Sequence, residues 1–410
     1  MSILKNKASK AALVVGAMGL AVTLAVPTAA QADPNTTGRT YQISGSDTIE
    51  AVYNGLTNGY TVGGVARGPF QGTVGSWDAF GSPDPITPKS GGQAVGRPHG
   101  SGDGVKALSA AWNPAKDVFT QVVGGVTTNY DLKNGVATGV DSVNDGVREF
   151  DFARSSSKPG TPVVSGSAND KLTFVPFARD AVTPVIQDPA GGVNYSSVAG
   201  LTIDELNAIF GDGASDSGRI TNSAGKVYFS GLELKPVLPQ ASSGTRTFFL
   251  GAIGVTTPAS WVTQGVAEND ASALTVEGQI APFSSAQWIA QKNGVGTSTF
   301  GGTNGATLRL VSFNNGTTTA LAATGTTTLA PNPVVYGSAT GIVTAATPLA
   351  RDTYTVVPTA NYTGTLATFV NGLDDATYFS GGTKYVVEDF GFLHLTYGGT
   401  TGQFFSNWTN

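Results

Sequence analysis

Three short turns combine glycine with hydroxyl side chains. They read Gly45-Ser46-Asp47-Thr48, Gly100-Ser101-Gly102-Asp103-Gly104 and Ser242-Ser243-Gly244-Thr245. Each precedes apolar residues at helical spacing, and the start of a helix presents unpaired N–H groups and a partial positive charge. Glycine lets the backbone approach a ligand closely, and serine and threonine add hydroxyl donors. Each turn alone fits ordinary helix capping, whereas three converging turns would form a neutral pocket for a tetrahedral oxyanion.

Strand-like and helix-like segments alternate around these turns, which predicts an α/β fold with open sheets. In such sheets ligands bind at the carboxyl ends of the strands, where loops lead into helices. Thr202 and Glu205 form a predicted capping box at the start of one helix. Pro184 predicts that a strand over 182–186 lies at a sheet edge. The other expected strands are 41–43, 150–154, 172–177, 234–238 and 354–357, and the expected helices are 49–56, 105–112, 202–210 and 246–253.

Residues 296–348 are rich in Thr, Gly, Asn and Ala and carry few charges. Strand-like runs at 308–311 and 334–336 favour β-hairpins or an inserted β-rich segment. A low-complexity linker is the alternative interpretation.

The composition excludes several kinds of chemistry. The chain has 0 Cys and 2 His, which removes disulfides, thiolate chemistry and a multi-histidine metal site. No G-x-S-x-G elbow and no Ser–His–Asp pattern is found, so we expect no enzyme activity, no cofactor and no metal. The length exceeds what one hydrophobic core fills, which predicts two lobes.

The N-terminus has the pattern of a secretory signal peptide. Lys5, Lys7 and Lys10 precede an apolar run over 11–26, and Ala30-Gln31-Ala32 gives a cleavage site. A membrane anchor is the rival reading, but a spanning helix needs roughly 20 apolar residues. The mature chain would begin near Asp33 with 23 − 3 = 20 basic against 28 acidic residues, a net charge of −8 that argues against nucleic-acid binding. No lipid-anchoring cysteine is present, so we expect a secreted or periplasmic protein.

Six segments together resemble the phosphate-binding component of phosphate ABC transporters, which has a type II periplasmic-binding-protein fold. They occur in the family's order between residues 40 and 290: GSDTIEAVY (45–53), GSGDGVKAL (100–108), DFARSSSKP (151–159), FVPFARDAVTPVI (174–186), LTIDELNAIFGDG (201–213) and SSGTRTFF (242–249). The SGT turn and the LT-x-x-x-L-x-x-IF helix are the more specific of these segments.

The resemblance implies a set of phosphate donors and also two departures from the family. Where the family often carries an Asp that accepts the proton of phosphate, this chain has Ser155-Ser156, so Asp47 could replace that acceptor or could merely cap a helix starting at Thr48. Where the family often places an Arg, this chain has Pro239 and Gln240, so Arg246 or Arg154 could supply the guanidinium. The expected ligand-binding residues are Ser46, Asp47, Thr48, Ser101, Ser155, Ser156, Ser243, Gly244, Thr245 and Arg246.

Two other segments allow two interpretations each. Arg179-Asp180 is either an ion pair at a hinge or a ligand-facing group, and Glu268-Asn269-Asp270 either lines the cleft or forms a solvated loop.

These observations predict a two-lobed type II periplasmic-binding-protein fold with a ligand cleft between the lobes and a β-rich insertion near 296–348. The expected division is a signal peptide (1–32), lobe I (33–178 and 346–410) and lobe II (179–345). The expected function is binding of an oxyanion, phosphate above others, by a monomer that could serve an ABC-transporter permease. The alternative is a secreted surface or adhesion protein that uses this fold without transport.

Overall fold

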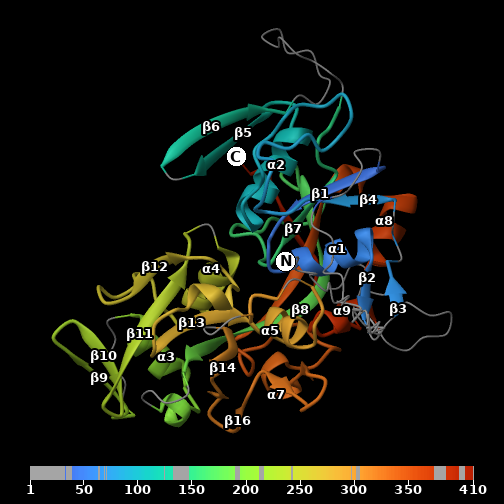
Figure 1. The fold of residues 1–410 in the computed structure, drawn as a ribbon. Helices are drawn as coiled ribbons and strands as arrows, with labels where there is room; N and C mark the ends of the chain where they lie inside the picture. The colour runs from blue at the N-terminus through green and yellow to red at the C-terminus, as the bar shows by residue number, and fades with distance from the viewer. Residues whose placement is uncertain are drawn as a thin grey trace, which may run out of the picture.

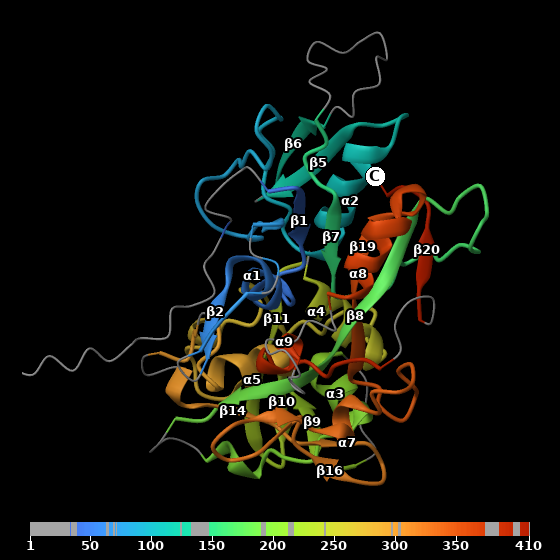
Figure 2. The same ribbon diagram turned by 90° about the vertical axis from the view of Figure 1, so that its right-hand side faces the viewer.

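Two long antiparallel strands, β8 (Leu172–Gln187) and β19 (Ala350–Pro358), run side by side through the middle of the molecule (Figure 2). Every residue of both strands is buried. They lie at the centre of a curled 12-stranded sheet, in which nine strands follow the order β4-β1-β7-β19-β8-β13-β11-β10-β9, while β12 pairs with β11, and β14 and β20 pair with β8. The halves of the molecule above and below them in Figure 1 are therefore connected through continuous strands.

The computed structural model describes residues 33, 39–62, 65–68, 70, 72–123, 125–132, 147–189, 194–211, 217–241, 243–296, 298–301, 305–373, 385–396 and 402–409. The expected signal peptide, residues 1–32, lies outside the described residues. No helix in the described part of the chain is long and apolar enough to cross a membrane.

The upper half in Figure 1 contains parallel strands followed by helices. Strand β1 lies between β4 and β7, and helix α2 packs against β7 and β1. Its elements are β1 (Tyr41–Gly45), α1 (Glu50–Asn58), β2 (Tyr60–Val62), β3 (Val65–Arg67), β4 (Val74–Ser76), α2 (Ser101–Trp112), β5 (Val118–Val123), β6 (Val126–Asp131), β7 (Phe152–Ser155), α8 (Gly364–Asn371), α9 (Val386–Asp389) and β20 (Phe404–Ser406).

The lower half repeats the arrangement with parallel strands β11 and β13, each followed by a helix. Its elements are α3 (Ile203–Phe210), β9 (Ile220–Ser223), β10 (Lys226–Phe229), β11 (Leu232–Pro239), α4 (Gly244–Ala252), β12 (Thr263–Val266), β13 (Gln279–Ser284) and α5 (Ser285–Lys292). The segment after α5 contributes β14 (Leu308–Leu310), β15 (Phe313–Asn314), β16 (Thr319–Ala320), β17 (Ala323–Thr324), β18 (Ala330–Pro331) and α7 (Pro333–Tyr336).

Strand β8 serves the cores on both sides of the crossover. Its side chains up to Ala178 pack in the clusters that contain α1 and α2, whereas those from Ala181 onward pack in the clusters that contain α3, α4 and β13. This change of partner falls at Arg179 and Asp180, beside the expected boundary between the lobes; the lobe boundaries themselves stay a prediction.

The α/β class and the alternation of strands and helices are confirmed, as is the capping box of α3, in which Thr202 and Glu205 bond reciprocally. The prediction that Pro184 lies in a strand at a sheet edge was wrong. Residues 172–187 form one continuous strand, with β13 on one side and β14 on the other. Pro184 is tolerated there because it faces Pro282 of β13, while its carbonyl accepts a hydrogen bond from the Val311 N–H at 2.9 Å.

The strand expected at 334–336 is instead the short helix α7. Pro333 occupies its first position, and the Asn332 side chain caps it by accepting a hydrogen bond from the Val334 N–H. A proline at the first helical position does not weaken the helix, because the N–H group that proline lacks would have no partner within the helix there. The Thr/Gly-rich segment holds the three-residue strand β14, four two-residue strands and this helix; its status as an inserted β-rich unit stays a prediction.

Candidate functional site

The Gly/Ser/Thr turns meet where β1, β7 and β11 end, on the side of the crossover that carries α4. The Ser101 hydroxyl, at the start of α2, lies 3.1 Å from the Ser156 hydroxyl and accepts a hydrogen bond from the Ser156 N–H at 3.0 Å. From the other half, Gly244 at the start of α4 approaches both serines: a Cβ there would lie 2.3 Å from Ser156 Oγ and 3.0 Å from Ser101 Oγ. Glycine is therefore needed for this close approach of α4.

The second contact between the halves joins two threonines. Thr48 Oγ1 lies 3.3 Å from Thr245 Oγ1, and both side chains are fully buried. Ser101, Ser156, Gly244, Thr245 and Thr48 thus form one group, which we call the hydroxyl cluster. The structure brings these five expected residues together from four separate stretches of chain.

Arg351 of β19 supplies the positive charge at the hydroxyl cluster. Its Nη2 donates to Thr245 Oγ1 at 2.7 Å, to Thr48 Oγ1 at 3.2 Å and to Asp180 Oδ2 at 2.9 Å. Within the described residues its Nη1 is buried without a hydrogen-bond partner. A buried guanidinium beside hydroxyl groups, with one donor unused, is a strong feature for holding an oxyanion.

Sequence reasoning placed the guanidinium elsewhere and missed Arg351. Arg246 points away from the hydroxyl cluster, where it donates to the Pro239 carbonyl at 2.9 Å and to Gln264 Oε1 at 2.5 Å. Arg154 is fully buried and donates to the carbonyls of Ser46 (3.1 Å) and Trp77 (2.8 Å). A signal for Arg351 was present, because Arg-Asp occurs at both 179–180 and 351–352, close to the two expected boundaries between the lobes.

The remaining expected serines have local partners. Ser243 caps α4 by accepting a hydrogen bond from the Arg246 N–H at 2.9 Å, and the Ser155 hydroxyl donates to the Ser157 carbonyl at 2.7 Å. Ser46 is buried, its N–H donates to the Arg154 carbonyl at 3.0 Å, and its hydroxyl has no partner in the described chain. Ser243 and Ser46 thus lie in the same turns as the hydroxyl cluster, with their hydroxyls outside the contacts that define it.

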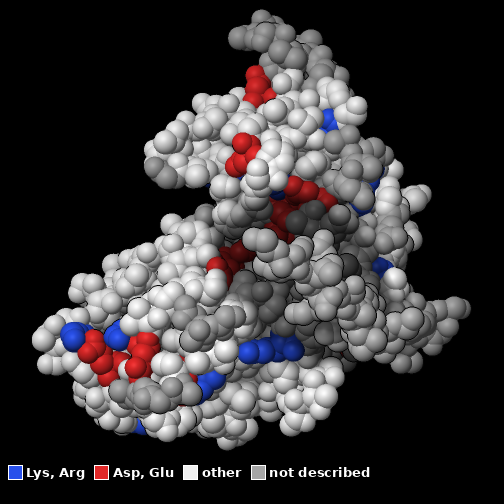
Figure 3. Space-filling view, in the orientation of Figure 1, with Lys and Arg blue, Asp and Glu red and all other residues white. Residues whose placement is uncertain are grey.

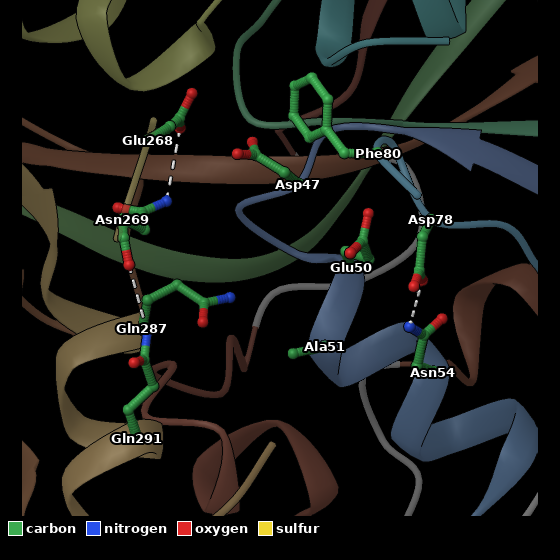
Figure 4. Close-up of a pocket in the computed structure, with 10 residues that line it drawn as sticks. All are labelled: Asp47, Glu50, Ala51, Asn54, Asp78, Phe80, Glu268, Asn269, Gln287 and Gln291. Atoms are coloured by element: carbon green, nitrogen blue, oxygen red, sulfur yellow. Dashed lines mark hydrogen bonds between the residues drawn. The ribbon is translucent and has the colours of Figure 1, made fainter. Parts of the chain in front are cut away.

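An acidic cavity of about 220 Å³ adjoins the hydroxyl cluster (Figure 4). Its carboxylates are Asp47, Glu50, Asp78 and Glu268, which we call the acidic cavity residues. The cavity is also lined by Ala51, Asn54, Phe80, Asn269, Gln287 and Gln291. Glu268 is 9% exposed and accepts a hydrogen bond from Thr48 Oγ1 at 3.0 Å, so Thr48 connects the hydroxyl cluster to the wall of the cavity. Figure 3 shows acidic atoms in a hollow between the two halves of the molecule.

Burial raises the pKa of Asp47, Glu50 and Asp78 in this cavity. Burial raises the pKa of Asp47 well above its usual range, and the charges of Glu268 and Glu50 add to the effect. The pKa of Glu50 is raised to about 8, chiefly by burial and then by Asp78, with Arg154 opposing the rise. Burial also raises the pKa of Asp78.

Three open alternatives can now be decided by geometry. Glu268 and Asn269 line the cavity and do not form a solvated loop. Arg179 forms an ion pair with Asp352, with 2.7 Å between Nε and Oδ1. Asp47 does not occupy the N-cap of α1, because that helix begins at Glu50 with Ile49 as its N-cap.

No group of three or more His, Cys, Asp or Glu side chains in the described ranges is arranged to hold a metal ion. The four carboxylates of the cavity are spread over its walls and come from three separate regions of the chain (Figure 4).

Comparison with known proteins gives one family match and several remote structural likenesses. Residues 87–372 match the family model described as a PBP superfamily domain. An ABC-type phosphate transport receptor from Vibrio cholerae is 15% identical, with a TM-score of 0.42 over 86% of this chain and 99% of that chain. A putative phosphate ABC transporter substrate-binding protein with bound phosphate from Clostridium perfringens is 13% identical, with a TM-score of 0.43 over 87% and 99%. No curated protein matches the chain. Because the matched residues form well over half of the sequence, the protein belongs to the PBP superfamily.

Proposed function

We propose that the protein is an exported solute-binding protein that holds an inorganic oxyanion, phosphate above others, between the hydroxyl cluster and Arg351. The observation that carries the proposal is the Arg351 guanidinium, which is 4% exposed, contacts Thr48 and Thr245 and keeps one buried donor unused among the described residues. Membership in the PBP superfamily supports solute binding in a cleft.

The hydrogen-bond donors of the site favour an anion at Arg351. Asp180 offsets the charge of the guanidinium, so the attraction comes from the unused Arg351 Nη1 and from the hydroxyls of Thr245 and Ser101, which can turn their hydrogens toward a ligand. Hydrogen bonds to a charged group contribute about 1.5–3 kcal/mol each, roughly twice a neutral bond. Several such bonds from Arg351, Thr245 and Ser101 suffice for specific binding of a small tetrahedral anion.

The biological role that follows is delivery or scavenging, without catalysis. The protein would act as a monomer outside the cytoplasm after cleavage near Asp33, with an ABC-transporter permease as its partner.

Calorimetry of the purified mature protein against phosphate, sulfate, arsenate and molybdate tests the proposal. We expect phosphate to bind and Ser101→Ala to weaken that binding about tenfold, because one donor to a charged ligand is lost. Ser197→Ala, an exposed serine in the other half, is the matched control. If none of the four anions binds, the oxyanion function is wrong and the surface or adhesion role becomes the better explanation.

In this proposal Asp47 sets the preference among anions. Phosphate at neutral pH keeps a proton that it can donate to a carboxylate, whereas sulfate has none, and a carboxylate facing sulfate would be repelled. Asp47 adjoins Thr48 and lines the cavity. We expect Asp47→Asn to narrow the ratio of phosphate to sulfate affinity at fixed salt and at a pH above the raised pKa of Asp47, where its carboxyl group is ionised. An unchanged ratio would assign Asp47 a purely structural role.

A further inference from the structure

Two buried groups of opposite charge contact the same threonine, and each has an unused polar atom. Arg351 Nη2 donates to Thr48 Oγ1 at 3.2 Å, and Thr48 Oγ1 donates to Glu268 Oε1 at 3.0 Å. Across the described part of the chain, neither Arg351 Nη1 nor Glu268 Oε2 has a hydrogen-bond partner. A buried polar atom without a partner is costly, so a pair of this kind indicates a ligand that satisfies both. Such a ligand would present an acceptor to Arg351 and a donor to Glu268.

The acidic cavity extends this requirement for a donor. The side-chain oxygen Asn54 Oδ1 is also buried and unpartnered among the residues described, and Asn54 lines the cavity only 3% exposed. Its amide nitrogen is already used, since it donates to Asp78 Oδ1 at 2.6 Å (Figure 4). The unused atoms in the cavity wall, Glu268 Oε2 and Asn54 Oδ1, are therefore both acceptors. Their natural partner is a group with several N–H donors.

Charge leads to the same conclusion. Glu50 lies 3.3 Å from Arg154, but Asp47, Asp78 and Glu268 form no salt bridge with any described residue. An inorganic phosphate dianion alone would add negative charge beside these carboxylates. A cation in the cavity would offset both, and it would lower the raised pKa values of Asp47 and Asp78 toward their usual range.

We propose that the ligand carries both charges: its oxyanion lies at Arg351 and the hydroxyl cluster, and its ammonium group lies in the acidic cavity. The chemical class is a small amine-bearing phosphate monoester or phosphonate. The inference rests on the proposed function, because it requires the oxyanion site, and it adds a second subsite in the direction of Glu268 and Asn54. A cavity of about 220 Å³ accommodates an aminoalkyl arm of a few carbons.

Calorimetry with three ligands tests the second subsite. The probes are inorganic phosphate, 2-aminoethyl phosphate and propyl phosphate, the last having the same number of heavy atoms as the amine but no charge in its arm. We expect 2-aminoethyl phosphate to bind at least about tenfold more tightly than propyl phosphate, since one charge-assisted hydrogen bond is worth that much. Equal affinities for the two esters would overturn the inference while phosphate binding still supported the proposed function. If none of the three ligands binds, both the further inference and the proposed function are wrong.

Two variants place the preference in the cavity. Glu268→Gln and Asp78→Asn keep the size of the side chain and remove its charge, so we expect each to reduce the ratio of amine to propyl ester affinity about fivefold or more. Glu233→Gln, which removes a partly exposed carboxylate paired with Lys226 on a remote hairpin, is the control and should leave the ratio unchanged. A ratio that is unaffected in both folded cavity variants would overturn the inference.

Discussion

The two arginines of the crossover strands differ in what surrounds them, although each belongs to an Arg-Asp pair. The antiparallel register sets Arg351 opposite Asp180 and Asp352 opposite Arg179, so the two ion pairs are adjacent. Arg179 donates to Asp352 and to the carbonyls of Ser338 (2.8 Å) and Gly341 (2.7 Å). Arg351 donates to Asp180 and to the hydroxyls of Thr48 and Thr245.

The difference between these neighbours separates a structural arginine from a binding one. A carbonyl oxygen can only accept, so the guanidinium of Arg179 is held in place by fixed backbone acceptors. The hydroxyl of Thr245 can accept from Arg351 and at the same time donate to a ligand. Successive residues of a strand point to opposite faces, so one Arg-Asp pair serves packing against the segment after α7 and the other serves the cleft.

The largest effect is expected from removing the structural arginine. Arg179→Met leaves Asp352 buried without its cation, so we expect the free energy of unfolding to fall by about 3–5 kcal/mol. Urea denaturation measures this loss, and calorimetry on the folded fraction should give an unchanged anion affinity. A variant that is as stable as the parent protein would contradict the structural role of Arg179 and with it the contrast to Arg351.

The converse substitution tests the binding arginine. Arg351→Lys keeps a positive charge near Asp180 but loses the planar fork that reaches Thr48 and Thr245. We expect oxyanion affinity to fall about tenfold to a hundredfold by calorimetry, with a smaller change in stability than Arg179→Met causes. Arg179→Lys is the matched control and should leave the affinity unchanged. Equal losses of affinity in both lysine variants would contradict the division of roles.

A third test concerns the close approach of the two halves. Gly244→Ala would place a Cβ 2.3 Å from Ser156 Oγ, so the hydroxyl of Ser156 must turn away from Ser101. We expect anion affinity to fall about tenfold, since one donor to the ligand is misplaced. Gly251→Ala in the same helix meets nothing within 4 Å and is the control. Similar affinities for the two variants would mean that the halves do not need to meet at Gly244.

Local sequence signals predicted much of this arrangement. The turns at Gly45, Ser101 and Gly244 each precede a helix, and the side chains of Thr48, Ser101 and Thr245 lie in the hydroxyl cluster. These predictions succeeded because a turn after a strand, with glycine and a hydroxyl, is a local signal. Strand ends in a parallel sheet then meet at one edge, which explains why distant turns gather.

What the sequence could not give depended on strand register. Whether Arg351 or Arg246 faces the hydroxyl cluster is decided by the pairing of β8 with β19, and a shift by one residue would exchange the faces of Arg351 and Asp352. The acidic cavity was missed for a similar reason, because Glu50, Asp78 and Glu268 lie in separate segments with no shared motif. The edge prediction for Pro184 failed because its neighbour across the sheet is another proline, Pro282, which the sequence alone could not show.

A third buried arginine, Arg154, extends the comparison to the acidic cavity and gives the smallest predicted effect. Arg154 is bound by carbonyls as Arg179 is, but its acid partner Glu50 lies 3.3 Å away with 22% of its side chain exposed. The pKa of Glu50 is raised to about 8 from 4.5, so the folded protein retains a proton that the unfolded chain has lost between these pH values. The free energy of unfolding must therefore fall as pH rises through this window.

Glu50→Gln removes this contribution, and we expect the fall in the free energy of unfolding between pH 5 and pH 8 to shrink by about 1 kcal/mol. Water at the exposed edge of the carboxylate reduces this amount. Asp47 and Asp78, whose pKa values are also raised, would maintain the rest of the slope. Urea denaturation at pH 5, 6, 7 and 8 measures it, with Glu233→Gln as the control outside the cavity. Parallel pH profiles for the parent and Glu50→Gln would show that Arg154 holds Glu50 ionised, as a purely structural ion pair would require.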